Sequence, residues 1–218
     1  EQLAGHPQGT RPVHLSAKLV PGLKQMSLRE GATLFMALMA GFQWLLSRYA
    51  RQKDVAVGTI VANRNRLELE NLIGFFVNTL VFRVDASGAL TFRQFLKQGR
   101  ETALQAYAHK DMPFEKLVEE LNPDRDLGGT PFFQAFMTLQ NAPAGSWDLH
   151  GLRVEDVNAE LREAKFDLCL MLIESESGVE GQLSYAADLL APESIDQIIQ
   201  HYVNLLERAV EQPDVPLA

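Results

Sequence analysis

Two neighbouring stretches, LFMALMAGF at residues 34–42 and DVAVGTIVA at residues 54–62, establish the architecture. In the first, apolar residues recur at three- and four-residue steps and also fill the positions between, which predicts a helix packed between other elements. In the second, a short β-branched run without strict alternation is typical of a strand covered on both faces. We therefore expect a helix over residues 33–49, with Thr33 as its N-cap, packed on a sheet that contains residues 54–62.

The other predicted elements alternate between strand and helix early in the chain and become mostly strands later. Helices are expected over residues 21–29, 91–109, 113–121 and 192–211, and strands over residues 13–20, 74–84, 132–140, 152–157, 166–174 and 179–185. Residues 1–20 are predicted to be an N-terminal linker leading into a first strand, and residues 21–218 to be one unit. This order favours an α/β layered fold, a mixed sheet covered by helices.

Composition excludes several classes of protein. The chain has 218 residues and a net charge of −8, so its surface should repel the phosphate backbone of nucleic acids. The apolar run at residues 34–42 is too short for a membrane span, which needs about 20 residues. No secretory signal pattern opens the sequence. These features predict a soluble, cytoplasmic protein without a nucleic-acid or membrane partner.

Generic catalytic motifs are missing from the sequence. It contains no glycine-rich phosphate loop, no zincin helix and no nucleophile elbow. The five histidines are scattered, and each is interpreted as a surface or capping residue. Cys169 is the only cysteine, so a cysteine-built metal site is excluded. We therefore expect no metal site and no bound cofactor.

Three segments are unusual in composition: IGFFVNT at residues 73–79, HKDMPFE at residues 109–115 and RDLGGTPFF at residues 125–133. The first places the amide of Asn78 among apolar residues where a predicted strand begins. The second places His109 and Asp111 just before a helix, and the third opens with Arg125 and Asp126. Taken singly, each has an ordinary structural explanation. Asn78 would be an amide that satisfies backbone groups at a strand edge, Asp111 a helix cap, and Arg125 with Asp126 a surface ion pair.

Taken together and in this order, the three segments resemble motifs in the C-terminal half of the condensation domain of nonribosomal peptide synthetases. The family's IGxFVNT…R motif is matched at residues 73–79 with Arg83, and its HxDxPFE motif at residues 109–115. Its RDxSxxPLF-like motif is matched in part, since Gly128 and Phe132 replace the usual Ser and Leu. The resemblance covers nearly the whole chain from about Gly22 onward.

The resemblance implies a chloramphenicol acetyltransferase-like fold of two similar lobes with a tunnel between them. Such a domain joins two acyl groups held as thioesters on the phosphopantetheine arms of donor and acceptor peptidyl carrier proteins, next to an adenylation domain. The family's HHxxxDG motif belongs to the N-terminal lobe, and this chain has no His-His pair. The resemblance thus implies one lobe, inactive alone and without a catalytic residue. Asn78 and Arg83 are expected to order the tunnel wall, and His109, Asp111 and Arg125 to tie loops together. Asp126 is a further candidate of the same motif region.

Two other interpretations stay open. The chain could be a condensation-like module that only docks carrier proteins or tailoring enzymes, which a degraded HHxxxDG upstream would favour. A free-standing acyltransferase is disfavoured because no base is paired with an orienting group. The Pro/Gly-rich residues 141–151, with Trp147, are expected to reach toward the missing lobe.

Overall fold

The computed structural model describes residues 6–64, 67–69, 72–121, 130–140, 151, 163–175 and 177–217. Its elements run in the order β1 (His6–Ser16), α1 (Leu19–Arg29), α2 (Leu34–Ala50), β2 (Asp54–Ala62), a short 3-10 helix (Leu67–Leu69), β3 (Val77–Asp85), α3 (Phe92–Ala108), α4 (Phe114–Leu121), β4 (Ala135–Gln140), β5 (Glu163–Ala164), β6 (Leu168–Ser175), β7 (Gly178–Ala186) and α5 (Pro192–Glu211). The predicted mixed α/β architecture is confirmed.

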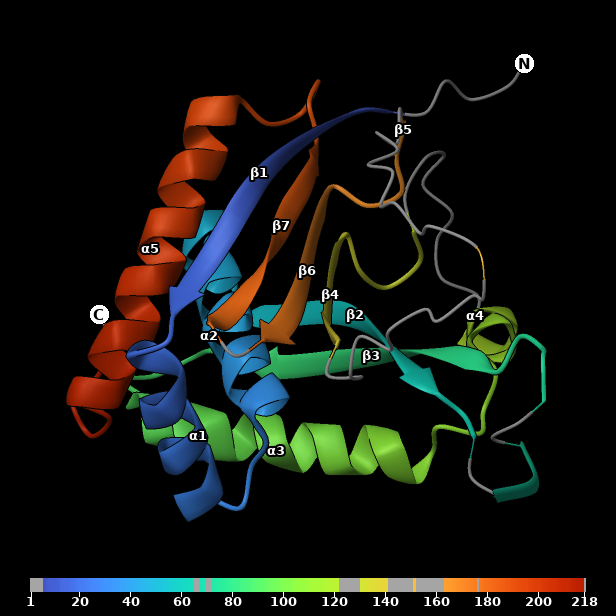
Figure 1. The fold of residues 1–218 in the computed structure, drawn as a ribbon, viewed down its shortest axis with the longest axis horizontal. Helices are drawn as coiled ribbons and strands as arrows, with labels where there is room; N and C mark the ends of the chain where they lie inside the picture. The colour runs from blue at the N-terminus through green and yellow to red at the C-terminus, as the bar shows by residue number, and fades with distance from the viewer. Residues whose placement is uncertain are drawn as a thin grey trace.

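The seven strands form a mixed sheet in the order β3-β2-β4-β6-β7-β1-β5 (Figure 1). The β2–β4 and β4–β6 pairs are parallel, and the other pairs are antiparallel. The β2–β4 pairing is confined to Val57 opposite Ala135 and Gly58 opposite Phe136. The sheet therefore opens on either side of this short contact, and that opening creates the cavities described below.

The apolar helix α2 lies at the centre of the core, as predicted. Thr33 caps it, since its Oγ1 accepts a hydrogen bond from the backbone N–H of Met36 at 3.2 Å. Phe42 is buried, and the neighbouring Gln43 is buried too but donates from Nε2 to the carbonyl oxygen of Phe82 in β3 at 2.8 Å. This bond satisfies a polar group that burial would otherwise destabilise. Helices α1, α3 and α5 pack around α2.

The sheet has one face covered by these helices and one that the described helices cover only in part. Along β6, Leu170 and Leu172 are buried in the core, whereas Ile173 is half exposed. Along β2, Val57 is fully buried and Ile60 is 47% exposed. The expectation that residues 54–62 are covered on both faces is thus wrong for the described part of the chain. The second face lines cavities instead.

The first strand starts earlier than predicted. β1 begins at His6 and pairs with β7 from Gln8 opposite Ala186 to Ser16 opposite Gly178. Gly9 fits there because a Cβ atom would come within 2.3 Å of the Tyr185 ring. Pro12 is tolerated because β5 pairs with β1 only near His6, so no described strand occupies the other side of β1 at Pro12. Residues 6–12 are therefore sheet rather than linker, and residues 17–20 are not strand.

Most other boundaries agree with the predictions within a few residues. α5 coincides with the predicted residues 192–211, and the β6–β7 hairpin is present. β3 begins at Val77 rather than residue 74, β4 at Ala135 rather than residue 132, and β6 at Leu168 rather than residue 166. The strand predicted over residues 152–157 lies outside the described residues. None of the described helices has the length and apolar character needed to cross a bilayer.

Candidate functional site

Asn78 connects the start of β3 to the turn between α3 and α4. Its Nδ2 donates to the carbonyl oxygens of Lys110 and Met112, each at 2.7 Å. Its Oδ1 accepts from the backbone N–H of Thr79 at 2.9 Å and from that of Phe114 at 3.2 Å. One side chain thus holds three backbone groups of residues 110–114 against the strand. The predicted role of Asn78, holding backbone groups through its amide, agrees with this geometry.

The two other polar residues of the turn lie beside this network. His109 follows the last residue of α3, and its Nδ1 donates to the carbonyl oxygen of Gln105 at 2.9 Å. It therefore closes the last turn of α3, where a side chain that satisfies an orphan carbonyl is favourable. Asp111 is exposed on the turn and lines the second of the two cavities described below. Both residues thus belong to the loop that Asn78 fixes.

Arg83 lies farther along β3, away from Asn78. Its Nε donates to Oδ1 of Asp54 at 2.8 Å, in a bidentate pair between the antiparallel strands β2 and β3. The Arg83 guanidinium lowers the pKa of the Asp54 carboxyl, and both side chains are largely exposed. Asn78 and Arg83, which are predicted to order one wall, thus lie at two different cavities. Arg125 and Asp126 lie outside the described residues.

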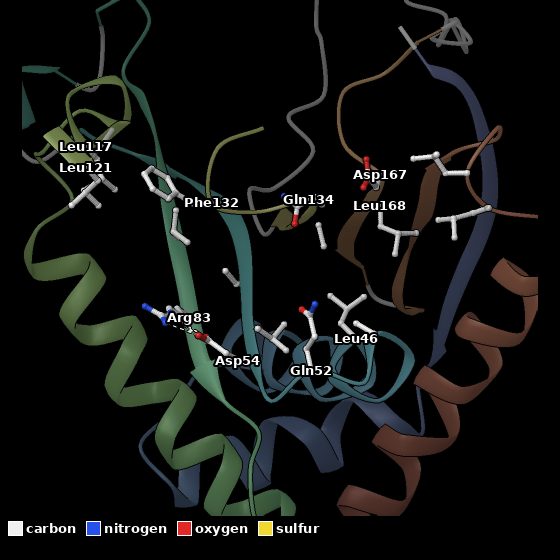
Figure 2. Close-up of a pocket in the computed structure, with 17 residues that line it drawn as sticks. Leu46, Gln52, Asp54, Arg83, Leu117, Leu121, Phe132, Gln134, Asp167 and Leu168 are labelled. Carbon is white, nitrogen blue, oxygen red and sulfur yellow. Dashed lines mark hydrogen bonds and ion pairs between the residues drawn. The ribbon is translucent and has the colours of Figure 1, made fainter. Parts of the chain in front are cut away.

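The first cavity, beside Arg83, has a volume of about 730 Å³ (Figure 2). Leu117 and Leu121 of α4 lie on one side of it, and Asp167 and Leu168 at the start of β6 lie on the other. The Arg83–Asp54 pair stands at its edge. The cavity combines apolar walls with a few polar groups, as ligand pockets do.

The second cavity, beside Asn78, has a volume of about 860 Å³. Its lining comes from the loop before β3, from the turn before α4, and from the sheet face that the core helices leave open. The lining residues are Gln8, Ile60, Asn63, Phe75, Phe76, Val77, Asn78, Thr79, Asp111, Pro113, Glu115, Phe136, Glu163, Ala164, Lys165, Phe166, Cys169, Met171, Gln182 and Ser184. Its lining residues are spread along the chain from Gln8 to Ser184, so the cavity exists only when the sheet is folded.

A phenylalanine cluster lies between the two cavities. The Phe136 and Phe166 rings are stacked at 4.5 Å with an interplanar angle of 2°, and Phe133 lies 5.7 Å from Phe166. Phe114, at the start of α4, packs 5.8 Å from Phe133. Phe133 fits over Gly58, because a Cβ at that position would come within 2.3 Å of its ring. The cluster thus fixes α4 against β2 and separates the cavities.

The titratable groups of this region include one buried thiol, that of Cys169. Burial raises the pKa of the Cys169 thiol to about 11, with Lys165 opposing the shift, so the thiol is neutral at physiological pH. Within the described ranges, no group of three His, Cys, Asp or Glu side chains is arranged to hold a metal ion. The site therefore consists of apolar walls, backbone groups held in fixed positions, and polar side chains that can form hydrogen bonds.

Several of these features escaped the sequence analysis. The phenylalanine cluster draws on residues 114, 133, 136 and 166, which are far apart in the chain, and the pairing of β4 with β6 brings Phe133 and Phe136 next to Phe166. The glycine in the stretch DVAVGTIVA was the one available sign of a close approach, since a glycine inside a strand often marks one. Cys169 carries no local signal. Trp147, expected to reach across, lies outside the described residues.

Comparison with known proteins assigns this architecture to a class. The fold is the chloramphenicol acetyltransferase-like fold of condensation domains. The chain matches 49% of the X-domain chain in a solved complex of the X-domain and OxyB from teicoplanin biosynthesis, with 99% of this chain covered, 26% identity and a TM-score of 0.87. It matches 51% of the condensation domain of the Monacolin K polyketide synthase MokA, with full coverage of this chain, 19% identity and a TM-score of 0.86, a likeness of fold alone.

The sequence comparisons name the family. The family model "Condensation domain" matches residues 7–218. The chain is 40% identical over 200 residues to tyrocidine synthase 3 of Brevibacillus parabrevis, a match that covers 92% of this chain and 3% of that protein. It is 37% identical over 203 residues to gramicidin S synthase 2 of Brevibacillus brevis, covering 92% of this chain and 5% of that protein. This chain belongs to the condensation-domain family of nonribosomal peptide synthetases. It spans about half of the two solved chains above and a small fraction of these two relatives.

Proposed function

We propose that this chain is the C-terminal lobe of a condensation domain and that the open face of its sheet forms one wall of the tunnel between two lobes. The proposal rests on how much of each related structure this chain covers. Essentially the whole chain superimposes on only about half of each condensation-type structure described above. The three motifs identified in the sequence also belong to the C-terminal half of the family's domain.

The exposed apolar residues support an interface on the open face. Ile73 and Phe75, in the loop before β3, are 105% and 91% exposed, and Ile60 projects from the same side of β2 as the second cavity. Large apolar side chains that gather on one exposed surface are typical of a contact site. A facing lobe that covers them would turn the open second cavity into an enclosed passage.

The reaction assigned to such a passage is amide formation between two carrier-bound substrates. The acceptor amine attacks the donor thioester carbonyl, the C–N bond forms, the C–S bond breaks, and the amine proton leaves with the departing thiolate. Holding both reactants in a near-attack geometry supplies much of the rate enhancement in reactions of this kind. This chain would position the two substrates and would not itself react with them. Asn78 would keep the loop of residues 110–114 against β3, and the HHxxxDG lobe would supply the histidines.

Carrier proteins would bring both substrates on phosphopantetheine arms, and an adenylation domain would load the acceptor carrier. We expect this assembly to act in the cytoplasm. The chain itself needs no bound cofactor for this role, because the arms belong to the carriers.

Deuterium exchange tests the proposed wall. The upstream half of the same domain is added to the chain, and exchange is followed residue by residue. We expect slower exchange in residues 72–77 and in β6, and unchanged exchange on the exposed surface of α5, which serves as the internal control. Protection confined to the helices, with none in residues 72–77, would contradict the proposal.

A docking module without amide-forming activity is the second candidate. The similarity to an X-domain solved in complex with OxyB favours it, because that domain binds another protein. The two candidates differ upstream of this chain. An intact HHxxxDG motif would support the enzyme, and a degraded one would support docking.

A further inference from the structure

A third hollow lies in the helix layer, on the side of α2 that faces α5. Its volume is about 380 Å³. Its walls come from α2, from α5 and from the residues that follow α5, and it shares no lining residue with the two cavities of the candidate site. The lining residues are Trp44, Leu45, Arg48, Tyr49, His201, Asn204, Leu205, Arg208, Ala209, Gln212, Val215, Pro216 and Leu217.

The wall formed by residues 212–217 is held in place by several bonds. The backbone N–H of Leu217 donates to the carbonyl oxygen of Leu90 at 2.8 Å. Nε of Arg93 donates to Oδ1 of Asp214 at 2.7 Å, and the same guanidinium pairs with Glu30. These contacts fix the segment to α3 and to the end of α1. The hollow is therefore a built feature of the fold.

Two arginines line the hollow without an anionic partner. Within the described part of the chain, neither Arg48 nor Arg208 has a carboxylate within 4.0 Å, whereas Arg11 and Arg83 are each paired with an aspartate. The guanidinium of Arg48 lies 4.1 Å from the centroid of the Trp44 ring. A stacked guanidinium still carries N–H donors in its own plane, arranged to match a carboxylate. In a chain of net charge −8, this is a local cationic site.

The remaining lining is apolar on the floor and polar at one edge. Trp44, Leu45 and Ala209 are buried, and Leu205 is partly so. At the edge, Tyr49 Oη and His201 Nδ1 share a hydrogen bond of 2.8 Å across the two helices. The volume is at the low end of the range for ligand pockets, about 300–1,000 Å³, which suits a few side chains rather than a large cofactor.

We propose that this hollow docks a short acidic protein segment. Two of its carboxylates would pair with Arg48 and Arg208, and an apolar side chain between them would pack on the Trp44 floor. Charge complementarity favours this occupant, because its carboxylates would meet two guanidiniums that have no carboxylate partner among the described residues, on a chain whose net charge is −8. The site is separate from the proposed tunnel wall, so it stands or fails independently of the proposed function.

Peptide titration tests the proposal in a Trp147→Phe background, where Trp44 is the only tryptophan. The probe is an acetylated seven-residue peptide in which Glu and Asp alternate with Leu, and its partner carries Gln and Asn at the acidic positions. Binding is followed by Trp44 fluorescence. The double variant Arg48→Gln/Arg208→Gln is compared with Arg29→Gln/Lys97→Gln, which removes the same charge from exposed positions elsewhere. Circular dichroism checks that both variants are folded.

We expect saturable binding of the acidic peptide, equal within about twofold in the control variant and weakened about tenfold or more in the double variant, since tenfold corresponds to about 1.4 kcal/mol. Binding should also weaken as salt is raised. The proposal is overturned if the double variant binds equally well, or if the Gln/Asn peptide binds equally well. It is also overturned if no saturation occurs up to about 1 mM, or if inorganic phosphate competes at concentrations equal to those of the peptide.

Discussion

Replacing Asn78 by alanine should loosen the turn before α4 and destabilise the whole chain. The substitution removes the side chain that bonds to Lys110, Met112 and Phe114. A net hydrogen bond contributes about 0.5–1.5 kcal/mol, and water can replace part of these bonds because the site is half-buried. We therefore expect a loss of about 2 kcal/mol in the free energy of unfolding. For a chain of this size, that lowers the Tm by about 4–8 °C.

The Asn78→Asp variant separates hydrogen bonding from simple loss of volume. It keeps the acceptor for the Phe114 N–H, but it places a carboxylate against the carbonyl oxygens of Lys110 and Met112. We expect those two carbonyl oxygens, which lose their donor, to outweigh the N–H groups of Thr79 and Phe114 that favour the charged form, so the pKa of the introduced carboxyl should be higher in the folded state than in the unfolded state. The loss in free energy of unfolding caused by the charged carboxylate is then complete above the folded-state pKa, and it is relieved as the pH falls through that pKa.

Thermal unfolding followed by circular dichroism over a pH series measures both effects. At neutral pH, Asn78→Asp should be at least as unstable as Asn78→Ala, and the difference should shrink in acid. Asn204→Ala, which removes an exposed asparagine that accepts one bond from Gln200 on α5, is the control and should change the Tm little. An unchanged Tm for Asn78→Ala would refute the role we assign to this amide. So would an Asp variant as stable as the wild type at neutral pH.

Three further predictions concern the region around the cavities. Gly58→Ala should destabilise the chain by about 1–3 kcal/mol, because the new Cβ meets the buried Phe133 ring, and a Gly58→Ala/Phe133→Leu double variant should recover part of the loss in urea unfolding. Cys169 should react with a disulfide reagent at pH 8 far more slowly than free cysteine, with a rate that keeps rising toward pH 11; a rate equal to that of free cysteine would contradict its raised pKa. Arg83→Ala should shift the Tm by less than about 2 °C, because the pair with Asp54 is exposed; a larger shift would mean that the pair is structural.

The sequence predicted the core better than the surface. α2 and α5 were located within a residue or two because their apolar periodicity is clear and because Thr33, the N-cap of α2, and Pro192, the first residue of α5, mark where the helices begin. β1 was misjudged because Gly9 and Pro12 usually signal a linker. Only the Tyr185 ring and the side of β1 that no described strand occupies explain why they fit in a strand.

The sequence identified individual residues of the candidate site, but it did not show how those residues are arranged in space. The motif resemblance identified Asn78, and its apolar context predicted a bond to backbone groups. The sequence could not show that the same strand carries Arg83 to a different cavity, since the two cavities are separated by residues from other strands and from α4. It could not show the phenylalanine cluster either, because the parallel pairing of β4 with β6 brings Phe136 next to Phe166, and Phe114 joins the cluster from α4 through Phe133.

Our central claim is that this chain is one lobe of a two-lobed catalyst. The most direct test mixes donor- and acceptor-loaded carrier proteins with this chain, with the upstream lobe, and with both, and quantifies the amide product by mass spectrometry. We expect no product above the uncatalysed rate with this chain alone, and product when the upstream lobe with an intact HHxxxDG motif is added. Amide formation by the 218-residue chain alone would show that one lobe suffices for catalysis and would refute the two-lobe proposal.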